Sequence, residues 1–250
     1  MNDFMKLAFF DAHNYERHSF GEENERLPSP HQITFFETRL VPETLKLARG
    51  YEAICVFVND QLNAAAIDEL AESGVKFIAL RSAGFNNVDL VACAKRGITV
   101  VRVPAYSPHA VAEHALAMIL SLNRKIHRAY QRVRELNFSL EGLVGFDLHG
   151  KTVGVIGTGK IGAVFAKNMA GLGCSVVAYD KTQNDDLKHQ GAIKYLSLEE
   201  LYLVSDIISL HVPLTPQTRH LINEKAIAQM KSGVMLINTG RGALIDTKAL

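Results

Sequence analysis

Three glycines with the spacing Gly157-x-Gly159-x-x-Gly162 are the part of this sequence with the clearest chemical meaning. Gly157 permits a tight turn, Gly159 lets backbone N–H groups approach a pyrophosphate, and Gly162 lets a following helix pack closely. The positive end of that helix then faces the phosphates. The pattern alone is weak evidence, because glycines can take this spacing by coincidence in an ordinary βα unit.

The elements around the glycines are those that a dinucleotide site requires. The apolar run Thr152–Ile156 predicts a strand before them, and apolar residues at helical spacing follow them. A second apolar run, Ser175–Tyr179, is closed by Asp180, about 20 residues beyond the glycines. A carboxylate there accepts hydrogen bonds from ribose hydroxyls and repels a 2′-phosphate, so the sequence predicts NAD rather than NADP.

Composition restricts the class of protein. The 250 residues fit one large or two small domains, and 27 basic against 26 acidic residues give no reason to expect nucleic acid or an anionic membrane. No apolar run could span a bilayer, and acidic Asp3 and Asp11 argue against a signal peptide. Cys55, Cys93 and Cys174 lack metal-ligand spacing. We therefore expect a soluble cytoplasmic protein without a metal site.

Strands alternate with helices over residues 1–103, which predicts a parallel sheet covered on both faces. This part has no phosphate-binding glycine loop, so we expect a separate domain with another role, the substrate domain. The predicted strands are Leu7–Phe10, Ile33–Phe36, Ala53–Phe57, Phe77–Leu80 and Thr99–Val103. The predicted helices are Tyr15–Glu25, Pro42–Ala48, Ala64–Glu72 and Leu90–Arg96.

A break at Pro104–Pro108 opens the second domain, residues 104–250. Ser107 followed by Pro108 predicts an N-cap and the first turn of a long helix, which we expect to act as a hinge. The basic segment after it holds Arg124, Lys125, Arg128, Arg132 and Arg134, and it fits either a solvated helix face or a subunit contact.

Two more strands, Asp206–Leu210 and Val234–Asn238, are predicted after the glycine unit. Ser197 to Glu200 form a capping box that opens a helix. Asp246 is interpreted as the N-cap of a further helix, and because a helix cut in its first turn is marginal we expect this domain to be incomplete at its C-terminus.

Polar motifs follow three of the predicted strands, at the edge where open parallel sheets bind ligands. They are RSAGF at 81–85, HVPLT at 211–215 and NTGRG at 238–242. Arg241 offers a planar fork of donors suited to a carboxylate, and the glycines beside it free its backbone. The alternative for Arg241 is a surface ion pair.

Several segments, in this order, resemble the D-2-hydroxyacid dehydrogenase family, most closely its fermentative NAD-dependent D-lactate dehydrogenases. They are IALRSAGFNNVDL, VPAYSPHAVAEHALAMILSLNR, VIGTGKIG, SLHVPLTPQTRHLIN and MLINTGRGALID. The resemblance extends over the whole chain. It implies an α/β protein of two flavodoxin/Rossmann-like doubly wound parallel-sheet domains, with substrate and cofactor bound in the cleft between them.

The resemblance also assigns roles to residues. Arg241 would grip the carboxylate of a 2-keto acid and polarise its carbonyl, the Ala83 and Gly84 amides would hold the other side of that carboxylate, and Tyr106 would contact the substrate. Lys160 and Ile161 match the pyrophosphate turn, Asp180 the ribose carboxylate, Val212-Pro213 the adenosine side and Thr239–Arg241 the nicotinamide side. The expected NAD-binding set is Gly157, Gly159, Lys160, Ile161, Gly162, Asp180, His211, Val212, Pro213, Thr218, Thr239, Gly240 and Arg241.

The predicted reaction is the reversible, NADH-dependent reduction of pyruvate to D-lactate. Alternatives are reduction of 2-ketoisocaproate or hydroxypyruvate, a non-catalytic NADH-binding protein similar to corepressors, and a cofactor-binding fragment without activity. The resemblance further implies a homodimer or homotetramer formed through the region of the long helix.

The family's proton relay, a Glu/His pair downstream of the arginine motif, has no counterpart in this sequence. His211 lies near the expected cofactor but has no evident carboxylate partner. His109 and His114 neighbour Glu113 on a predicted helix and are interpreted as packing or capping residues.

Overall fold

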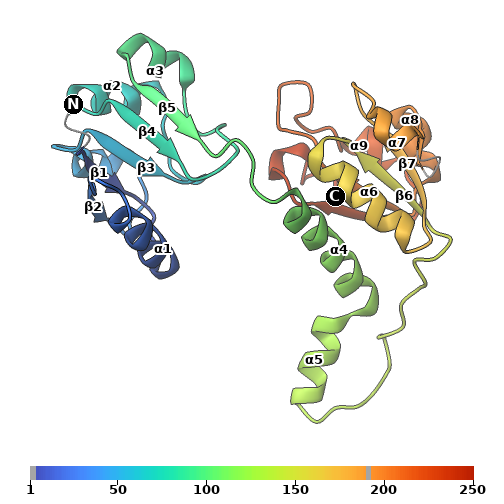
Figure 1. The fold of residues 1–250 in the computed structure, drawn as a ribbon. Coiled ribbons are helices and arrows are strands. Elements are labelled where there is room, and N and C mark those ends of the chain that lie inside the picture. The colour runs from blue at the N-terminus through green and yellow to red at the C-terminus, as the bar shows by residue number, and fades with distance from the viewer. Residues whose placement is uncertain (1–3, 190–192) are drawn as a thin grey trace. The chain divides into compact units, whose positions relative to one another are not determined.

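The structure is a computed structural model that describes residues 4–189 and 193–250. It consists of two compact units, Met1–Tyr106 and Ser107–Leu250, each built on its own five-stranded parallel sheet (Figure 1). The sequence predicts a boundary after Val103, and the division observed here follows Tyr106. The predicted fold class, α/β with doubly wound parallel sheets, is confirmed.

The first unit has the strand order β2-β1-β3-β4-β5. Its strands are β1 (Lys6–Phe9), β2 (Gln32–Phe35), β3 (Ala53–Val56), β4 (Phe77–Leu80) and β5 (Thr99–Arg102). One face is covered by η1 (Pro42–Ala48), α2 (Ala64–Glu72) and α3 (Leu90–Arg96), whose apolar side chains share a core with alternate strand residues. Phe9 and Cys55 point to the opposite face, where Phe20 of α1 (Asn14–Glu25) packs on Phe9 with ring centroids 4.9 Å apart.

One helix of this unit differs in type from the expectation. Residues Pro42–Ala48 form a 3₁₀ helix. The Thr44 hydroxyl accepts a hydrogen bond from the Val41 amide and donates one to the Arg39 carbonyl at 2.6 Å. Such local side-chain bonds compete with the i→i−4 bonds of an α-helix, which explains the tighter winding.

The second unit has the strand order β10-β9-β6-β7-β8. Its strands are β6 (Thr152–Ile156), β7 (Ser175–Tyr179), β8 (Ile193–Tyr195), β9 (Ile207–Leu210) and β10 (Met235–Asn238). Helices α4 (Pro108–Arg124) and α6 (Lys160–Gly171) pack on one face of the sheet, and α8 (Leu198–Val204) and α9 (Glu224–Ile227) pack on the other. The shorter elements are α5 (Ile126–Arg134), α7 (Asp185–His189) and η2 (Gly242–Leu244).

The predicted helix caps were correct in two of three cases. The Ser107 hydroxyl accepts a hydrogen bond from the Ala110 amide at 3.1 Å, and Ser197 forms the predicted capping box with Glu200. Asp246 Oδ1 accepts a hydrogen bond from the Lys248 amide at 3.2 Å, as an N-cap does, but the residues after it form only a turn, in which the Ala249 amide donates to the Asp246 carbonyl. That i→i−3 bond closes a single turn rather than an α-helical ring.

The basic segment is divided between two helices, because Lys125 takes a left-handed conformation (φ 51°) that ends α4 and begins α5. Helix α5 has no buried residue. Lys125 and Arg132 donate to backbone carbonyls of the loop that follows, at Val144, Ser139 and Glu141. Two of the five basic residues of this segment therefore hold the loop in place. Across the described residues, no helix is long and apolar enough to cross a membrane.

Candidate cofactor and substrate site

The glycine turn follows β6 and leads directly into α6. Gly157 has φ +96°, and its amide donates to the Tyr179 carbonyl of β7 at 2.8 Å. A Cβ on Gly157 would lie 2.8 Å from the His211 backbone, and a Cβ on Gly162 would collide with the Gly157 carbonyl. Both positions therefore require glycine for close backbone packing, as a dinucleotide turn does.

The start of α6 offers free donors to an anion. Its N-cap is Gly159, which has no side chain to satisfy the first-turn amides, and a Cβ placed there would meet only open space. Among the described residues, the amides of Gly159, Lys160 and Ile161 have no acceptor. Free N–H groups at the positive end of a 12-residue helix suit a pyrophosphate, so this part of the structure fits NAD.

Asp180 lies beside this turn, at the carboxyl end of β7. Its Oδ2 accepts the Thr158 amide at 2.5 Å and the Thr158 hydroxyl at 3.1 Å, while its Oδ1 accepts the Thr182 amide at 3.2 Å. The carboxylate is therefore held in one orientation next to the glycine turn. This is the position that a carboxylate needs in order to accept a ribose hydroxyl.

His211 follows β9 and packs under the same turn. Its ring lies 4.9 Å from the ring of Phe165 in α6, and its Nε2 is 2.9 Å from the buried Ser209 hydroxyl. Desolvation by burial lowers the pKa of His211 to about 4. The imidazole is therefore neutral near pH 7, and its hydrogen-bond partner is a hydroxyl rather than a carboxylate.

The loop after His211 is held by Thr218. The Thr218 hydroxyl donates to the Pro213 carbonyl at 2.6 Å and accepts the Thr215 amide at 2.8 Å. Val212 and Pro213 are thereby fixed at the carboxyl edge of the sheet, with Val212 Cγ1 close to the position of a Cβ on Gly157. Thr218 contributes by shaping the loop, because its hydroxyl is already engaged.

Arg241 follows β10 at the same edge. Asn238 Nδ2 donates to the Arg241 carbonyl at 2.9 Å, and Asn238 Oδ1 accepts the Gly240 amide at 2.9 Å, so this side chain fixes the turn that contains Thr239 and Gly240. Arg241 is half-buried, and in the described part of the chain its guanidinium forms no ion pair or hydrogen bond. A guanidinium without a partner among the described residues is suited to an anion, and no surface ion pair is seen at Arg241.

In the first unit, the loop after β4 presents two amides in a similar way. The carbonyls of Ser82, Ala83 and Gly84 accept, respectively, the Val103 amide, the Arg102 guanidinium at 3.1 Å and the Ser82 hydroxyl at 2.8 Å. The amides of Ala83 and Gly84 have no acceptor among the described residues. Because the carbonyls are engaged, the free N–H groups are what this loop offers a ligand. Tyr106, further along the chain, is 59% exposed.

Arg81, immediately before this loop, is buried and does not face solvent. Its Nε donates to Glu16 Oε1 at 2.6 Å, its Nη2 donates to the Asp11 carbonyl at 2.7 Å, and its guanidinium lies over the rings of Phe9 and Phe57. Only 7% of the Arg81 side chain and 9% of the Glu16 side chain are exposed. The pair therefore closes the crevice between the ends of β1 and β3.

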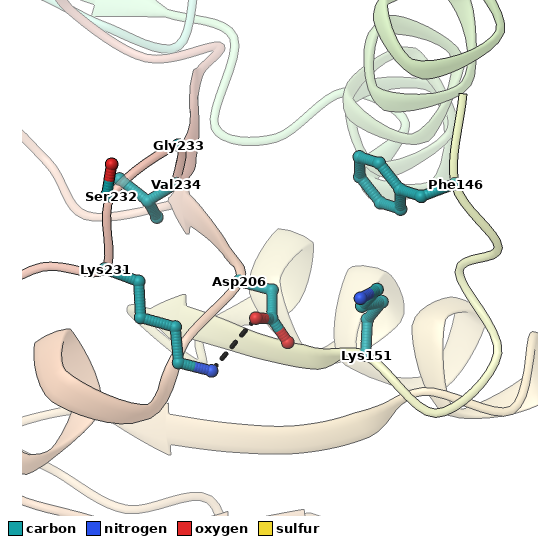
Figure 2. Close-up of a pocket in the computed structure, with 7 residues that line it drawn as sticks. All are labelled: Phe146, Lys151, Asp206, Lys231, Ser232, Gly233 and Val234. Carbon is teal, nitrogen blue, oxygen red and sulfur yellow. Dashed lines mark hydrogen bonds and ion pairs between the residues drawn. The ribbon is translucent and has the colours of Figure 1, made fainter. Parts of the chain in front are cut away.

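A cavity of about 200 Å³ lies at the opposite edge of the second sheet, where its strands begin (Figure 2). Asp206 lines this cavity. Its carboxylate accepts hydrogen bonds from Lys231 Nζ at 2.9 Å and from the Thr152 amide at 2.8 Å. Burial opposes ionisation of Asp206, but these two donors outweigh it and lower its pKa. Its carboxylate is thus committed to joining strand ends, and ligands of open α/β sheets bind at the other edge.

The strand order and the glycine turn place the second unit among the NAD-binding domains of oxidoreductases. Residues 116–250 match the family model of the D-isomer specific 2-hydroxyacid dehydrogenase NAD binding domain. The chain is 51% identical over 245 residues to D-lactate dehydrogenase of Escherichia coli, covering 98% of this chain and 74% of that protein. It is 53% identical over 247 residues to 2-hydroxyacid dehydrogenase homolog 1 of Schizosaccharomyces pombe, with the same coverages of 98% and 74%.

Solved structures agree with these matches. The apo-structure of the Escherichia coli D-lactate dehydrogenase matches with a TM-score of 0.90 over 98% of this chain and 77% of that chain. The Aquifex aeolicus D-lactate dehydrogenase, crystallised with NAD and lactic acid, matches with a TM-score of 0.83 at 40% identity, over 97% and 71%. The chain belongs to the D-2-hydroxyacid dehydrogenase family. The resemblance seen in the sequence and the prediction of NAD as cofactor are confirmed.

Sequence reasoning missed the residues that hold the others in position. Asn238 fixes the Arg241 turn, Arg102 engages a carbonyl of the substrate loop, and Tyr195 bonds Thr158 beside Asp180. Asn238 gave a usable signal, because asparagine after a strand and before glycine commonly bonds its own backbone. The contacts of Arg102 and Tyr195 depend on pairing between strands and gave no local signal.

Proposed function

We propose that this protein catalyses the reversible reduction of pyruvate to D-lactate with NADH. The observation that carries the proposal is Arg241, a half-buried guanidinium without an anionic partner in the described residues, at the carboxyl edge of the NAD-binding sheet. Such a group suits the carboxylate of a 2-keto acid. The names of the Escherichia coli and Aquifex aeolicus relatives, both D-lactate dehydrogenases, favour pyruvate as that acid.

The residues of the proposed site bind the substrate carboxylate and NADH, and one of them also polarises the substrate carbonyl. Arg241 grips the carboxylate and withdraws charge from the adjacent carbonyl, and the free amides of Ala83 and Gly84 hold the same carboxylate. Asp180 accepts a ribose hydroxyl, and the first turn of α6 binds the pyrophosphate. NADH, when bound, supplies the hydride to C2 of the keto acid.

The carbonyl oxygen also needs a proton. His211 is unsuited to donate it, because a pKa of about 4 leaves the imidazole without a transferable proton near pH 7. In the described residues, two histidines approach carboxylates within ion-pair range: His18 with Glu22 on α1, and His220 with Asp246 at 4.0 Å. The family resemblance assigns this step to a Glu/His pair downstream of Arg241, which is not among these residues.

The proposal is tested by NADH oxidation with pyruvate, 2-ketoisocaproate and hydroxypyruvate, together with the chirality of the product. We expect pyruvate to be turned over fastest and to give D-lactate. Faster turnover of another acid would reassign the substrate, and NADH binding without any turnover would favour a nucleotide-binding role for this chain.

The variant Arg241→Lys sharpens the same test. A lysine retains the positive charge but loses the two-pronged grip, so kcat/KM for the keto acid should fall by about 100-fold or more. The Kd of NADH should change little, which titration of the variant would show. Near-normal turnover by Arg241→Lys would remove this residue from the substrate site.

We also propose that the chain associates with a second copy through the segment 126–146. Large apolar side chains of this segment are more than half exposed: Ile126, Tyr130, Val133, Leu136, Phe138, Leu140 and Val144. Seven large exposed apolar side chains within one short segment are typical of an interface in soluble proteins. Light scattering should give a dimer or tetramer, and Leu136→Glu with Phe138→Glu should shift it to monomer; a monomeric wild-type chain would contradict this proposal.

A further inference from the structure

Three side chains form a directed hydrogen-bond chain that ends on the carboxylate at the close of β7. The Tyr195 hydroxyl of β8 donates to Thr158 Oγ1 at 2.9 Å, and the Thr158 hydroxyl donates to Asp180 Oδ2 at 3.1 Å. Thr158 is the residue between the first two glycines of the turn, and only 2% of it is exposed. We call Tyr195, Thr158 and Asp180 the ribose relay.

The direction of the relay is fixed from its outer end. The Asn184 amide donates to the Tyr195 oxygen at 3.0 Å, and Asn184 Nδ2 donates to the Thr158 carbonyl at 3.2 Å. With an N–H pointing at its oxygen, the Tyr195 phenol donates onward, and Thr158 in turn can only send its own proton to Asp180. Without the phenol, the Thr158 hydroxyl would be oriented only by its bond to Asp180.

The relay limits what Asp180 can still bind. A carboxylate has about four acceptor positions, two on each oxygen. Thr158 fills both positions on Oδ2 with its amide and hydroxyl, and the Thr182 amide fills one on Oδ1. One acceptor position on Oδ1 is left for a ligand, and it suits a hydroxyl donor. A 2′-phosphate brings negative charge and no hydrogen to this position at neutral pH.

We infer that Tyr195 and Thr158 are positioning residues that set the preference of this protein for NADH over NADPH. They do so by holding the Asp180 carboxylate in the orientation that accepts a ribose hydroxyl and opposes a 2′-phosphate. A carboxylate that loses the Thr158 hydroxyl is held by the Thr158 and Thr182 amides alone, so its orientation is less well fixed. It then binds the hydroxyl less well and repels the phosphate less strongly. The inference rests on the proposed role of Asp180 and is independent of the keto-acid substrate.

The test is the ratio of the Kd of NADPH to that of NADH, measured by calorimetry or by nicotinamide fluorescence in a chain that has no tryptophan. Thr158→Val removes the hydroxyl with little change of shape, and Tyr195→Phe removes its donor. We expect each to lower the ratio by about 5-fold to 10-fold, which corresponds to the net contribution of one ordinary hydrogen bond. Thr158→Ser retains the hydroxyl and should retain most of the ratio.

A matched control is Tyr202→Phe, which removes a buried phenol of α8 in the same unit but outside the relay. It should leave the ratio unchanged, and its melting temperature shows the effect of losing a phenol alone. If Tyr195→Phe and Thr158→Val raise both Kd values by the same factor, the relay is only structural and the inference is overturned. A wild-type chain without a preference for NADH would overturn it as well.

Asp180→Asn separates this inference from the proposed role of Asp180. If Asp180→Asn lowers the ratio while the relay variants do not, Asp180 remains the ribose carboxylate and the relay is refuted. If none of these variants moves the ratio, both assignments fail. Because each outcome is read from binding, loss or retention of pyruvate turnover does not affect the result.

Discussion

The two sheets of this protein differ most at the point where their strand order reverses. In the second unit, the crevice between the ends of β6 and β9 contains the glycine turn, and a Cβ at Gly159 would meet only open space. In the first unit, the corresponding crevice between β1 and β3 is closed by Arg81, bonded to Glu16 and to the Asp11 carbonyl. The same layered architecture therefore leaves a ligand-binding crevice open in one unit and fills it with a buried ion pair in the other.

The first unit presents free donors beside a neighbouring strand, β4. Two amides without an acceptor among the described residues follow β4, at Ala83 and Gly84, where protein donors engage the carbonyls of Ser82, Ala83 and Gly84. The second unit presents its free amides at a helix N-terminus, where the macrodipole adds to them. The helix end suits a pyrophosphate, and the pair of loop amides suits a smaller group such as one carboxylate.

The largest expected effect tests the open crevice. Gly162→Ala places a Cβ against the Gly157 carbonyl, and backbone cannot yield as a flexible side chain can. We expect a loss of stability of about 3 kcal/mol or more and a rise in the Kd of NADH of about 100-fold. Urea denaturation and NADH titration measure the two effects.

Two other glycines provide controls for this variant. Gly171→Ala, at the end of the same helix with no atom within 4 Å of the new Cβ, should be nearly neutral in both measurements. Gly159→Ala should keep most of the stability but raise the Kd of NADH by about tenfold, because its methyl group lies where the pyrophosphate would approach the backbone amides. Normal NADH binding by Gly162→Ala would show that the turn is not the phosphate site.

The next largest effect tests the filled crevice. Arg81→Met leaves the Glu16 carboxylate buried without its partner, which should lower the free energy of unfolding by about 3–5 kcal/mol. The double variant Arg81→Met with Glu16→Met removes both charges and should recover much of that loss. Denaturation of the single and double variants completes the cycle. If the double variant loses as much as Arg81→Met and Glu16→Met alone lose together, the pair is not energetically coupled, and the comparison of the two crevices loses its basis.

Local patterns were sufficient to predict most of the fold. The bounds of β4, β6 and β7, and of helices α2 and α3, are those that the sequence predicts, because each is a short apolar run or an amphipathic stretch with clear ends. The three-residue strand β8 and the short helices α7 and α9 were not predicted. Elements of this length carry little periodicity, and the neighbouring strand or sheet stabilises them instead.

The candidate site was predictable to a different extent. Residues that would touch a ligand, such as Gly159 and Arg241, carry a local signature, since their type and their place after a strand point to chemistry. Supporting residues, such as Tyr195 and Arg102, lie on other strands, and their contacts exist only once the sheet has formed. Pro42–Ala48 forms a 3₁₀ helix for a similar reason, because it depends on side-chain hydrogen bonds that the sequence periodicity does not reveal.

The smallest expected effect concerns the substrate loop. Arg102 Nη1 donates to the carbonyls of Ala83, Val103 and Pro104 at 3.1–3.3 Å, so one exposed side chain joins the loop to the segment that leaves the first unit. Arg102→Met removes these bonds without burying a charge, and it should raise the KM for the keto acid by about 3-fold to 5-fold with an unchanged melting temperature. The Kd of NADH, which depends on the other unit, should stay the same.

Two further variants decide whether Arg102 acts as a donor. Arg102→Lys should restore most of the KM, because a single nitrogen makes all three bonds and does not need the guanidinium fork. Arg96→Met removes an exposed arginine of α3 that pairs with Asp68, away from the loop, and should leave KM unchanged. If Arg102→Lys is as impaired as Arg102→Met, a donor at this position is not what holds the loop. The orientation of the Ala83 and Gly84 amides would then depend on the bonds made by Ser82 and the Val103 amide alone. In that case Ser82→Ala should raise the KM for the keto acid more than Arg102→Met does.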